Sequence, residues 1–313
     1  MKKLLTFLAL FSLLLGFKPE KANACACGCG VFNVGTSALI PNCQGGIAFL
    51  QYDYINQDHN WHKEKQANAS DNEDKEIKSQ TVTAGMQYMF NRSWGAAVRV
   101  PYLTRSVKMS EVDEDRGETM NHFSRVNSLG DIRVNGIYSG FSSDMSSGIT
   151  FGLKLPTGQA NAKGFDSRDL QIGTGSTDSI LGAYHLGRID NEGKLNWFAQ
   201  ANWQHAIITR NGYRVGDEIS AASGISYNAG SVFAAKKLVP ILQFTGSRRA
   251  HDTGWNSEPS NSGYSHAYFA PALELTFGQF KTYADIEFPI YQNTRGNQLI
   301  PSRIYKLILG YSF

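Results

Sequence analysis

The four cysteines of the chain lie close together near its amino terminus, where they could bind a metal. Cys25, Cys27 and Cys29 alternate with small residues, and Cys43 follows. Alternate side chains of an extended segment share one face, and glycine lets the backbone bend, so the thiolates could converge. Four thiolates suit a soft or borderline metal such as Cu or Zn. Two disulfides, for which four cysteines allow three connectivities, or lipidation of Cys25 are the alternatives.

A second candidate set consists of ionisable side chains in segments whose polar and apolar residues alternate. Mixed charges that project into one lumen can pair with each other, hold water and form an electrostatic filter for a solute. The alternative is that they are the satisfied polar filling of a narrow interior. The thirteen lumen-facing candidates are Asp53, Arg99, Asp131, Arg133, Lys154, His185, Glu218, His266, Glu274, Lys281, Asp285, Glu287 and Lys306.

Motifs of common enzymes are missing from the sequence. It contains no Gly-x-Ser-x-Gly elbow, no phosphate-binding loop and no His-Glu-x-x-His motif. We therefore expect that the protein is not an enzyme. A formal net charge of +3, with no cluster of basic residues, argues against a nucleic-acid partner.

The elements that position these side chains are predicted to be strands, and the pattern is clearest at the carboxy terminus. Tyr305 and every second residue after it, through Phe313, are apolar or aromatic, whereas the opposite face carries a lysine, a glycine and a serine. One face suits lipid and the other suits a water-filled lumen. An apolar strand that ends on an aromatic residue resembles the closing strand of bacterial outer-membrane barrels, whose final residue is part of the signal read by the assembly machinery.

About twelve such segments follow one another from residue 45 onward, which predicts an all-β fold, an antiparallel transmembrane β-barrel. A content of 31 glycines, 14 tyrosines, 18 phenylalanines and only nine prolines suits glycine turns and aromatic girdles. A soluble β-sandwich is the alternative. The predicted strands are 47–55, 81–90, 96–106, 129–140, 149–155, 179–187, 196–207, 219–227, 232–245, 265–277, 280–291 and 303–313.

The connections between these segments alternate in length. Short turns follow the even-numbered strands, and long polar loops follow the odd-numbered ones. This alternation predicts short periplasmic turns, long extracellular loops and both termini in the periplasm. The mixed charges of 59–79 make that stretch the nearest candidate for disorder. The predicted long loops are 57–79, 108–122, 157–178, 209–217, 248–263 and 292–301.

The chain is expected to have three regions. Residues 1–24 combine a basic start, a short apolar run and Ala22-Asn-Ala24, which together predict a secretory signal peptide. Residues 25–44 form the cysteine-rich segment, which is expected to lie in the periplasm or to plug the barrel. Residues 45–313 form the barrel. No apolar run of about 18 residues follows the signal, so no membrane-spanning helix is predicted.

Three motifs follow one another within the predicted barrel: Leu129-Gly-Asp-Ile132, Gly152-Leu-Lys-Leu-Pro-Thr-Gly158 and Ile172-Gly-Thr-Gly-Ser-Thr-Asp178. Together they resemble the transporter-like outer-membrane proteins grouped as the meta-pathway of phenol degradation family, over roughly 45–313. The opening Cys-Ala-Cys-Gly-Cys-Gly-Val-Phe is similar to a subset of them. The resemblance implies an outer-membrane β-barrel that moves hydrophobic or aromatic compounds, and it implies no site residues.

The residues of these motifs also allow two local predictions. Asp131 and Lys154 would face inward from neighbouring strands, so an ion pair between them is expected. Asp178 follows two glycines that permit tight backbone near the rim, and its carboxylate is expected to accept hydrogen bonds from loop amides.

These observations predict an outer-membrane channel or transporter for small solutes, with hydrophobic or aromatic compounds as the expected class. One alternative is a barrel that anchors a periplasmic cysteine-rich segment, which binds a soft metal or a redox partner. A second alternative is a structural barrel without transport. The expected partners are outer-membrane lipid, the barrel assembly machinery, a small-molecule solute and a periplasmic partner.

Overall fold

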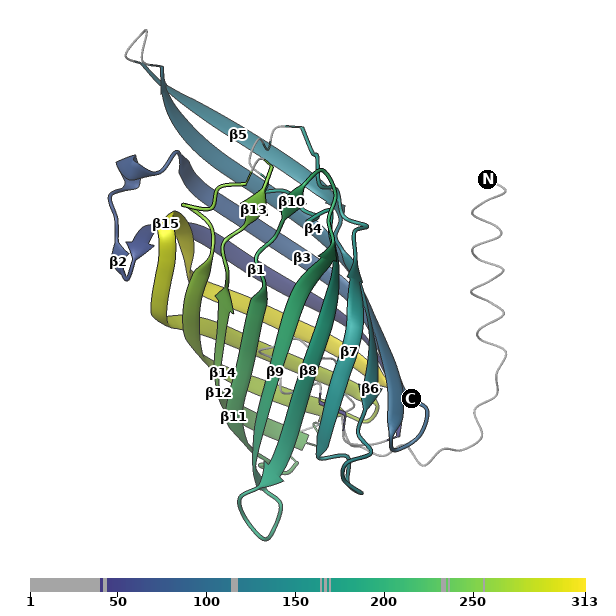
Figure 1. The fold of residues 1–313 in the computed structure, drawn as a ribbon. Helices are drawn as coiled ribbons and strands as arrows, with labels where there is room; N and C mark the ends of the chain where they lie inside the picture. Colours follow the sequence, from purple (N-terminus) through teal and green to yellow (C-terminus); the bar gives the residue numbers. More distant parts are fainter. Residues whose placement is uncertain are drawn as a thin grey trace, which may run out of the picture.

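The chain forms a closed β-barrel of antiparallel strands (Figure 1). The computed structural model describes residues 40–41, 44–113, 118–163, 165, 168, 170–231, 235, 237–255 and 257–313, and all structural statements concern these residues. Eleven strands follow one another around the ring in the order β15-β14-β12-β11-β9-β8-β7-β6-β4-β3-β1, and β1 pairs with β15 to close it. The predicted all-β antiparallel barrel is therefore confirmed.

The strands differ widely in length. The ring consists of β1 (Gly45–Lys63), β3 (Asp74–Met89), β4 (Trp94–Asp113), β6 (Ile132–Tyr138), β7 (Ser147–Leu155), β8 (Thr177–Arg188), β9 (Leu195–Ile208), β11 (Glu218–Tyr227), β12 (Lys237–Arg249), β14 (Tyr264–Phe277) and β15 (Phe280–Ser312). The remaining elements are β2 (Lys65–Gln66), a 3-10 helix (Ala69–Asp71), β5 (Glu118–Leu129), β10 (Tyr213–Arg214) and β13 (Thr253–Gly254). Of these, β5 extends the wall by pairing with the outer half of β4.

The 33-residue β15 contributes to the wall twice. Residues 280–294 pair with β14, and residues 294–312 pair with β1. Every pairing around the ring is antiparallel. Eleven elements cannot alternate in direction around a closed ring, so the chain must reverse inside β15. Gly296, with a φ of 74°, lies where the two runs meet and can adopt this left-handed conformation without strain.

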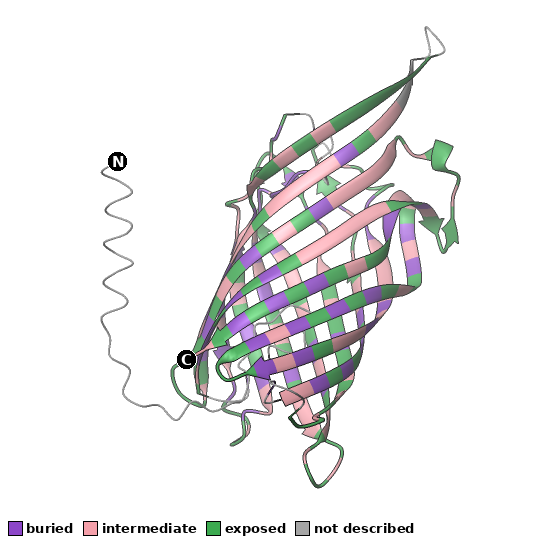
Figure 2. Cartoon of the chain, turned by 180° about the vertical axis from the view of Figure 1, so that it is seen from behind, coloured by how far each residue is buried: buried purple, intermediate pink, exposed green. Residues whose placement is uncertain are grey.

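Side chains alternate between the two faces of the wall, as the coloured bands along the strands in Figure 2 show. On the second run of β15, the side chains of the apolar face from Tyr305 to Phe313 are between 38 and 51% exposed. On the opposite face, Lys306 and Ile308 are buried. Phe313 closes the ring, because its backbone exchanges two hydrogen bonds with Gly46. The closing strand therefore pairs with the first strand, as expected.

The two ends of the barrel are built differently. One end carries the short connections between β3 and β4, β8 and β9, and β14 and β15, together with the start of β1 and the carboxy terminus. Exposed aromatic side chains gather at this short-turn end, including Tyr88, Trp94, Trp197, Phe280 and Tyr311. Aromatic rings at the edge of an outward apolar band are typical of transmembrane barrels.

At the opposite end, three predicted long loops are wrong because strands continue through them, and one of the three, 292–301, lies wholly within β15. Most of 57–79 and much of 108–122 belong to β1, β3, β4 and β5, including the predicted candidate for disorder. Backbone pairing tolerates the polar sequence, and the inward side chains Ile77, Val107, Met109 and Val126 find apolar partners in one cluster. The predicted strand 129–140 is in turn interrupted at 130–131, between β5 and β6.

Candidate functional site

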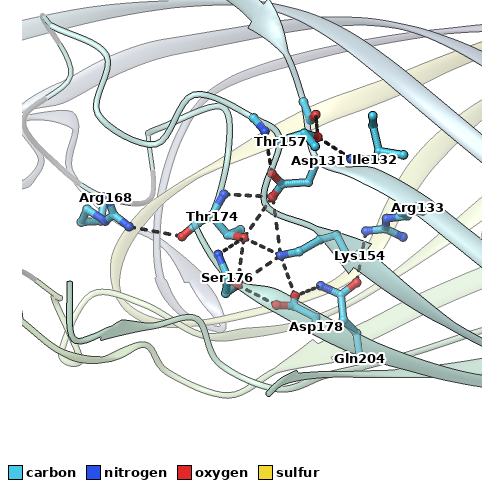
Figure 3. Close-up of polar contacts among 12 residues, drawn as sticks. Asp131, Ile132, Arg133, Lys154, Thr157, Arg168, Thr174, Ser176, Asp178 and Gln204 are labelled. Carbon is cyan, nitrogen blue, oxygen red and sulfur yellow. Dashed lines mark hydrogen bonds and ion pairs between the residues drawn. The ribbon is translucent and has the colours of Figure 1, made fainter. Parts of the chain in front are cut away.

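A buried ion cluster joins three neighbouring stretches of the barrel wall (Figure 3). Lys154, at the end of β7, is 3% exposed, and its Nζ lies 2.6 Å from Asp178 Oδ2 and 3.6 Å from Asp131 Oδ2. The same ammonium donates to the hydroxyl oxygen of Thr174 at 2.5 Å. Asp178 is fully buried and also accepts hydrogen bonds from Ser176 Oγ and Gln204 Nε2, each at 2.6 Å. We call Asp131, Lys154, Thr174, Ser176 and Asp178 the rim cluster.

The predicted ion pair between Asp131 and Lys154 is present, but Asp178 is the closer partner of the lysine. The loop amides bind Asp131 instead of Asp178: Gly158 N donates to Oδ1 at 2.9 Å, and Thr174 N donates to Oδ2 at 3.0 Å. The prediction that Asp178 receives the loop amides is therefore wrong. Asp178 is the second residue of β8 and the direct cross-strand partner of Lys154. Its oxygens are occupied by the ammonium of Lys154 and by the side-chain donors of Ser176 and Gln204.

All three motifs singled out in the sequence meet at the rim cluster. Gly158 and Gly173 let two of them touch through the backbone, since a Cβ on Gly173 would come within 2.4 Å of the Gly158 carbonyl group. Gly173 N also donates to the carbonyl of Gln159 at 2.8 Å. Glycine is the residue that permits such a close approach of two backbones. The motifs therefore share one structural task, which is to hold the 156–176 loop against the wall.

The described part of this loop has its own small core inside the barrel. Phe165 and Leu170 are buried against Val107, which points inward from β4. Arg105 lies two residues before Val107, on the same face, and donates to the carbonyls of Leu170 and Gln171 at 3.0 Å each. The loop thus lies across the inner face of the wall at the end opposite the short turns.

A chamber of about 330 Å³ lies in the lumen beside the rim cluster. Arg133 and Gln204 connect the two, because Arg133 Nη2 donates to Gln204 Oε1 at 3.1 Å and both side chains line the chamber. Ionisable and apolar side chains both line its wall. Among the lining residues are Arg133, Glu218, His266, Glu287, Tyr268, Ile55, Ile180 and Ile304.

The wall of the lumen formed by β1 and β15 carries an excess of carboxylates, namely Asp53, Asp285 and Glu287. Lys306 is the cation among them, and its Nζ lies 3.0 Å from Glu287 Oε1 and 3.8 Å from Asp285 Oδ2. The amide of Gln51 donates to both oxygens of Asp53, at 3.0 and 2.8 Å. These charges are thus held by protein partners, as expected for a polar lining in which an unpaired ion would be costly.

The structure places twelve of the thirteen predicted side chains on the inner face and one on the outer face. His185 is exposed, like Leu181 on the same strand, whereas its neighbour Tyr184 is buried. The prediction for His185 is therefore corrected. Its ring packs on Trp197 at 5.1 Å near the short-turn end of β8, where a polar ring suits the membrane interface. The inner-face residues are Asp53, Arg99, Asp131, Arg133, Lys154, Glu218, His266, Glu274, Lys281, Asp285, Glu287 and Lys306.

Beyond the outward apolar band, the outer face carries charge on the extended strands. Glu76 of β3 lies 2.7 Å from Lys78 and 2.6 Å from Lys108. Hydrogen bonds from Lys108 and then Lys78 lower the pKa of Glu76. Outward charges suit this end of the wall because strands that continue past a membrane face water.

The short-turn end of the lumen opens into a cavity of about 930 Å³. Glu274 and Lys281 pair across it at 3.3 Å. Ile40, ahead of β1, is buried there in an apolar cluster with Phe198 and Val239. Ile40 therefore lies inside this mouth.

The four cysteines, Cys25, Cys27, Cys29 and Cys43, lie outside the described residues, as does the predicted signal peptide. Within the part of the chain that the structure describes, no group of three or more His, Cys, Asp or Glu side chains is arranged to hold a metal ion. None of the helices described is long and apolar enough to cross a membrane.

Sequence reasoning did not select Thr174, Ser176, Asp178 and Gln204 as site residues. The first three lie in the third motif, so their sequence context was a usable signal. Gln204 carried no signal of its own. Its alternation with Ala206 on β9 would have placed it inward, but its bonds to Asp178 and Arg133 depend on which strands are neighbours.

Comparison with known proteins gives a likeness of fold. No family model and no curated protein matches the sequence. The chain superposes on the crystal structure of an outer-membrane channel from Pseudomonas putida F1 with a TM-score of 0.61 at 11% identity, over 95% of this chain and 100% of that one. The Pseudomonas putida toluene transporter TodX gives 0.46 at 10% identity, over 95 and 98% of the two chains, which is too low to establish a shared fold. The chain therefore has the fold of an outer-membrane β-barrel.

Proposed function

We propose that the protein is a channel or transporter of the bacterial outer membrane that passes small hydrophobic or aromatic solutes. The observation that carries the proposal is the closed wall with apolar side chains outside and polar, charged side chains inside. Such a wall satisfies all backbone groups in lipid and encloses a polar path. The likeness of fold to the Pseudomonas putida F1 channel supports it.

The finer arrangement is part of the same proposal. The wall makes about twelve passages, since β15 runs along it twice. The short turns and both chain termini lie on the periplasmic side, and the 156–176 loop lies at the extracellular end of the lumen. Residues 1–24 are removed as a signal peptide, outer-membrane lipid covers the apolar band, and the assembly machinery recognises the strand that ends at Phe313.

In this proposal, the twelve inner-face charges line the solute path instead of merely filling it. The chamber of about 330 Å³ beside Arg133 and Glu287 supports this role, because it leaves room for a small solute between opposite charges. Apolar contacts from Ile55, Ile180 and Tyr268 supply a surface for a ring or an alkyl chain.

Reconstitution tests the proposal directly. Purified protein in planar bilayers is expected to give discrete conductance steps in KCl, and proteoliposomes are expected to take up toluene or benzyl alcohol faster than empty vesicles. Heat-denatured protein is the control. A barrel that is folded by its shifted gel mobility, yet gives neither conductance nor uptake, would leave the structural barrel without transport as the better account.

A second candidate function concerns the cysteine-rich segment 25–44. The burial of Ile40 in the short-turn mouth supports a role of this segment as a plug at that side of the barrel. There it would bind a soft metal such as Cu or Zn, or a periplasmic redox partner. Elemental analysis and thiol titration of the mature protein test this. Two intact disulfides with no bound metal would remove the metal site, and a lipid mass on Cys25 would favour an anchor.

A further inference from the structure

Three cations stand side by side on the inner face of neighbouring strands. Arg99 of β4 is the direct cross-strand partner of Arg133 of β6, and Arg133 is the direct partner of Lys154 of β7. We call these three residues the cation row. Like charges directly opposite each other in an antiparallel sheet are destabilising, so such a row requires compensation.

The partners that offset the positive charge become fewer along the cation row, from Lys154 through Arg133 to Arg99. Lys154 has two carboxylates, in the rim cluster. Arg133 donates a hydrogen bond to the neutral amide group of Gln204, its one hydrogen-bond partner among the described residues. Arg99 is 5% exposed, and its Nε and Nη2 have no hydrogen-bond partner among the described residues. A buried guanidinium beside a second guanidinium is costly unless an anion accepts its hydrogen bonds.

Several buried polar side chains near Arg99 also have atoms without a hydrogen-bond partner among the described residues. Gln87 of β3 is fully buried, and neither its amide nitrogen nor its amide oxygen has a partner in the described structure. The same holds for Asn135 Oδ1 on β6 and for Thr150 Oγ1 on β7. Gln87 and Asn135 both pair with Ala97, two residues from Arg99. Buried polar groups are normally hydrogen-bonded. The unpaired polar atoms on these four strands therefore indicate a partner other than the side chains of the strands themselves.

The carboxylates of the lumen do not accept these hydrogen bonds, although Asp53 lies near enough to act on the charge of Arg99 through space. Asp53 accepts from Gln51, Asp285 accepts from Tyr283 at 2.6 Å, and Glu287 accepts from Thr245 and Lys306. Within the described residues, no hydrogen bond or ion pair joins any of these three carboxylates to Arg99 or Arg133.

We propose that Arg99 and Arg133 bind the carboxylate of a small organic monoanion on its way through the lumen. Planar guanidinium groups match a carboxylate with paired hydrogen bonds, and the amide of Gln87 can add a donor. The adjoining chamber takes the body of the solute against Ile180 and Tyr268. This proposal rests on the proposed channel function and narrows its solute class.

The acidic residues of the chamber explain why one carboxylate is favoured over two. Glu218 and Glu287 line the same chamber as Arg133, so a second carboxylate on the solute would meet like charge. A neutral hydroxyl or an apolar group at that position would not. The site therefore selects a monocarboxylate over a dicarboxylate of similar size.

Binding of benzoate to the purified full chain in nonionic detergent tests the site. Titration calorimetry is expected to show tighter binding of benzoate than of benzyl alcohol or terephthalate. Arg99→Gln and Arg133→Gln are each expected to lower the affinity ratio of benzoate to benzyl alcohol by about 10- to 100-fold, the usual effect of losing hydrogen bonds to a charged group. Arg303→Gln, which removes an exposed arginine from the outer face, should leave the ratio unchanged.

The outcomes separate this site from the channel function. A wild-type preference for benzyl alcohol, or an unchanged ratio in both lumen variants, would overturn the carboxylate site even if the protein conducts. Benzoate binding that depends on Arg99 in a protein that passes no solute would leave the site standing and remove the channel. Gel mobility before and after heating verifies that each variant is folded.

Discussion

Lys154 and Arg99 stand two strands apart in the same cross-strand row, on the same inner face, and both are almost fully buried. Lys154 has two carboxylates and a hydroxyl within reach. Arg99 has two nitrogens with no partner among the described residues. The first charge is part of the structure that holds the 156–176 loop, and the second stays available to a ligand.

The difference shows how one sheet can use buried charge for two purposes. At the rim, strand ends and a loop bring acceptors around Lys154, so the charge cross-links the chain. Along the middle of β4, neighbouring strands offer Arg99 only glycine and arginine as direct partners. A charge that the wall does not neutralise is the kind of group that binding sites retain at a cost in stability.

The largest expected effect comes from removing the rim cation. Lys154→Met leaves Asp131 and the fully buried Asp178 without their ammonium, and breaking a buried pair in this way costs about 3–5 kcal/mol of unfolding free energy. Urea unfolding in detergent, followed by tryptophan fluorescence, measures it. Lys78→Met is the matched control, because that lysine pairs with Glu76 on the outer face. Equal losses in the two variants would contradict a structural role for the rim cluster.

A smaller loss is expected where the loop meets the wall through backbone. In Gly173→Ala the new methyl group would overlap the Gly158 carbonyl, and overpacking of this kind costs about 1–3 kcal/mol. Gly246→Ala, whose nearest neighbour would be a carbonyl oxygen at 3.1 Å, is the control. Loosening of the loop is also expected to raise single-channel conductance. A Gly173→Ala protein with wild-type stability and conductance would show that the two backbones need not touch.

The sequence predicted the wall better than it predicted the contacts across it. Period-two alternation is a property of each strand alone, so it located the inner face for Asp53, Arg99 and Lys306 and the closure at Phe313. The pair of Asp131 and Lys154 could be predicted because both lie in motifs at neighbouring strand ends.

What sequence reasoning missed depends on neighbours that local pattern does not specify. Asp178 reaches Lys154 because β7 and β8 pair with these two residues directly opposite each other, a register that the pattern of one strand does not specify. The extended strands beyond residue 57 depend on apolar partners supplied by the 156–176 loop. The lack of partners at Arg99 is a property of three adjacent strands at once. His185 was assigned by polarity instead of by the parity of its strand.

Removal of the Arg99 charge is expected to change the unfolding free energy in the opposite direction from removal of the Lys154 charge. Arg99→Met takes away a buried charge and keeps an apolar stem, so the unfolding free energy should stay the same or rise, by no more than about 1 kcal/mol. The same urea unfolding measures it. A loss comparable to that of Lys154→Met would mean that Arg99 already has strong partners within the folded chain, which would break the contrast between the two ends of the row.

The smallest change in unfolding free energy is expected for a substitution on the outer face of the wall. His185→Phe keeps the contact with Trp197 and removes an exposed hydrogen bond between the ring and Ser147 Oγ at 2.7 Å, which water can replace, so the change in unfolding free energy should lie within about 0.5 kcal/mol. His266→Phe is its counterpart on the inner face, where the histidine ring bonds Ser247 Oγ at 2.7 Å and stacks on Tyr264. That variant leaves the partly buried Ser247 hydroxyl without this partner and should cost about 1–3 kcal/mol. If the two substitutions had equal effects, the parity that puts His185 outside and His266 inside the wall would be in error, because only their facing distinguishes them.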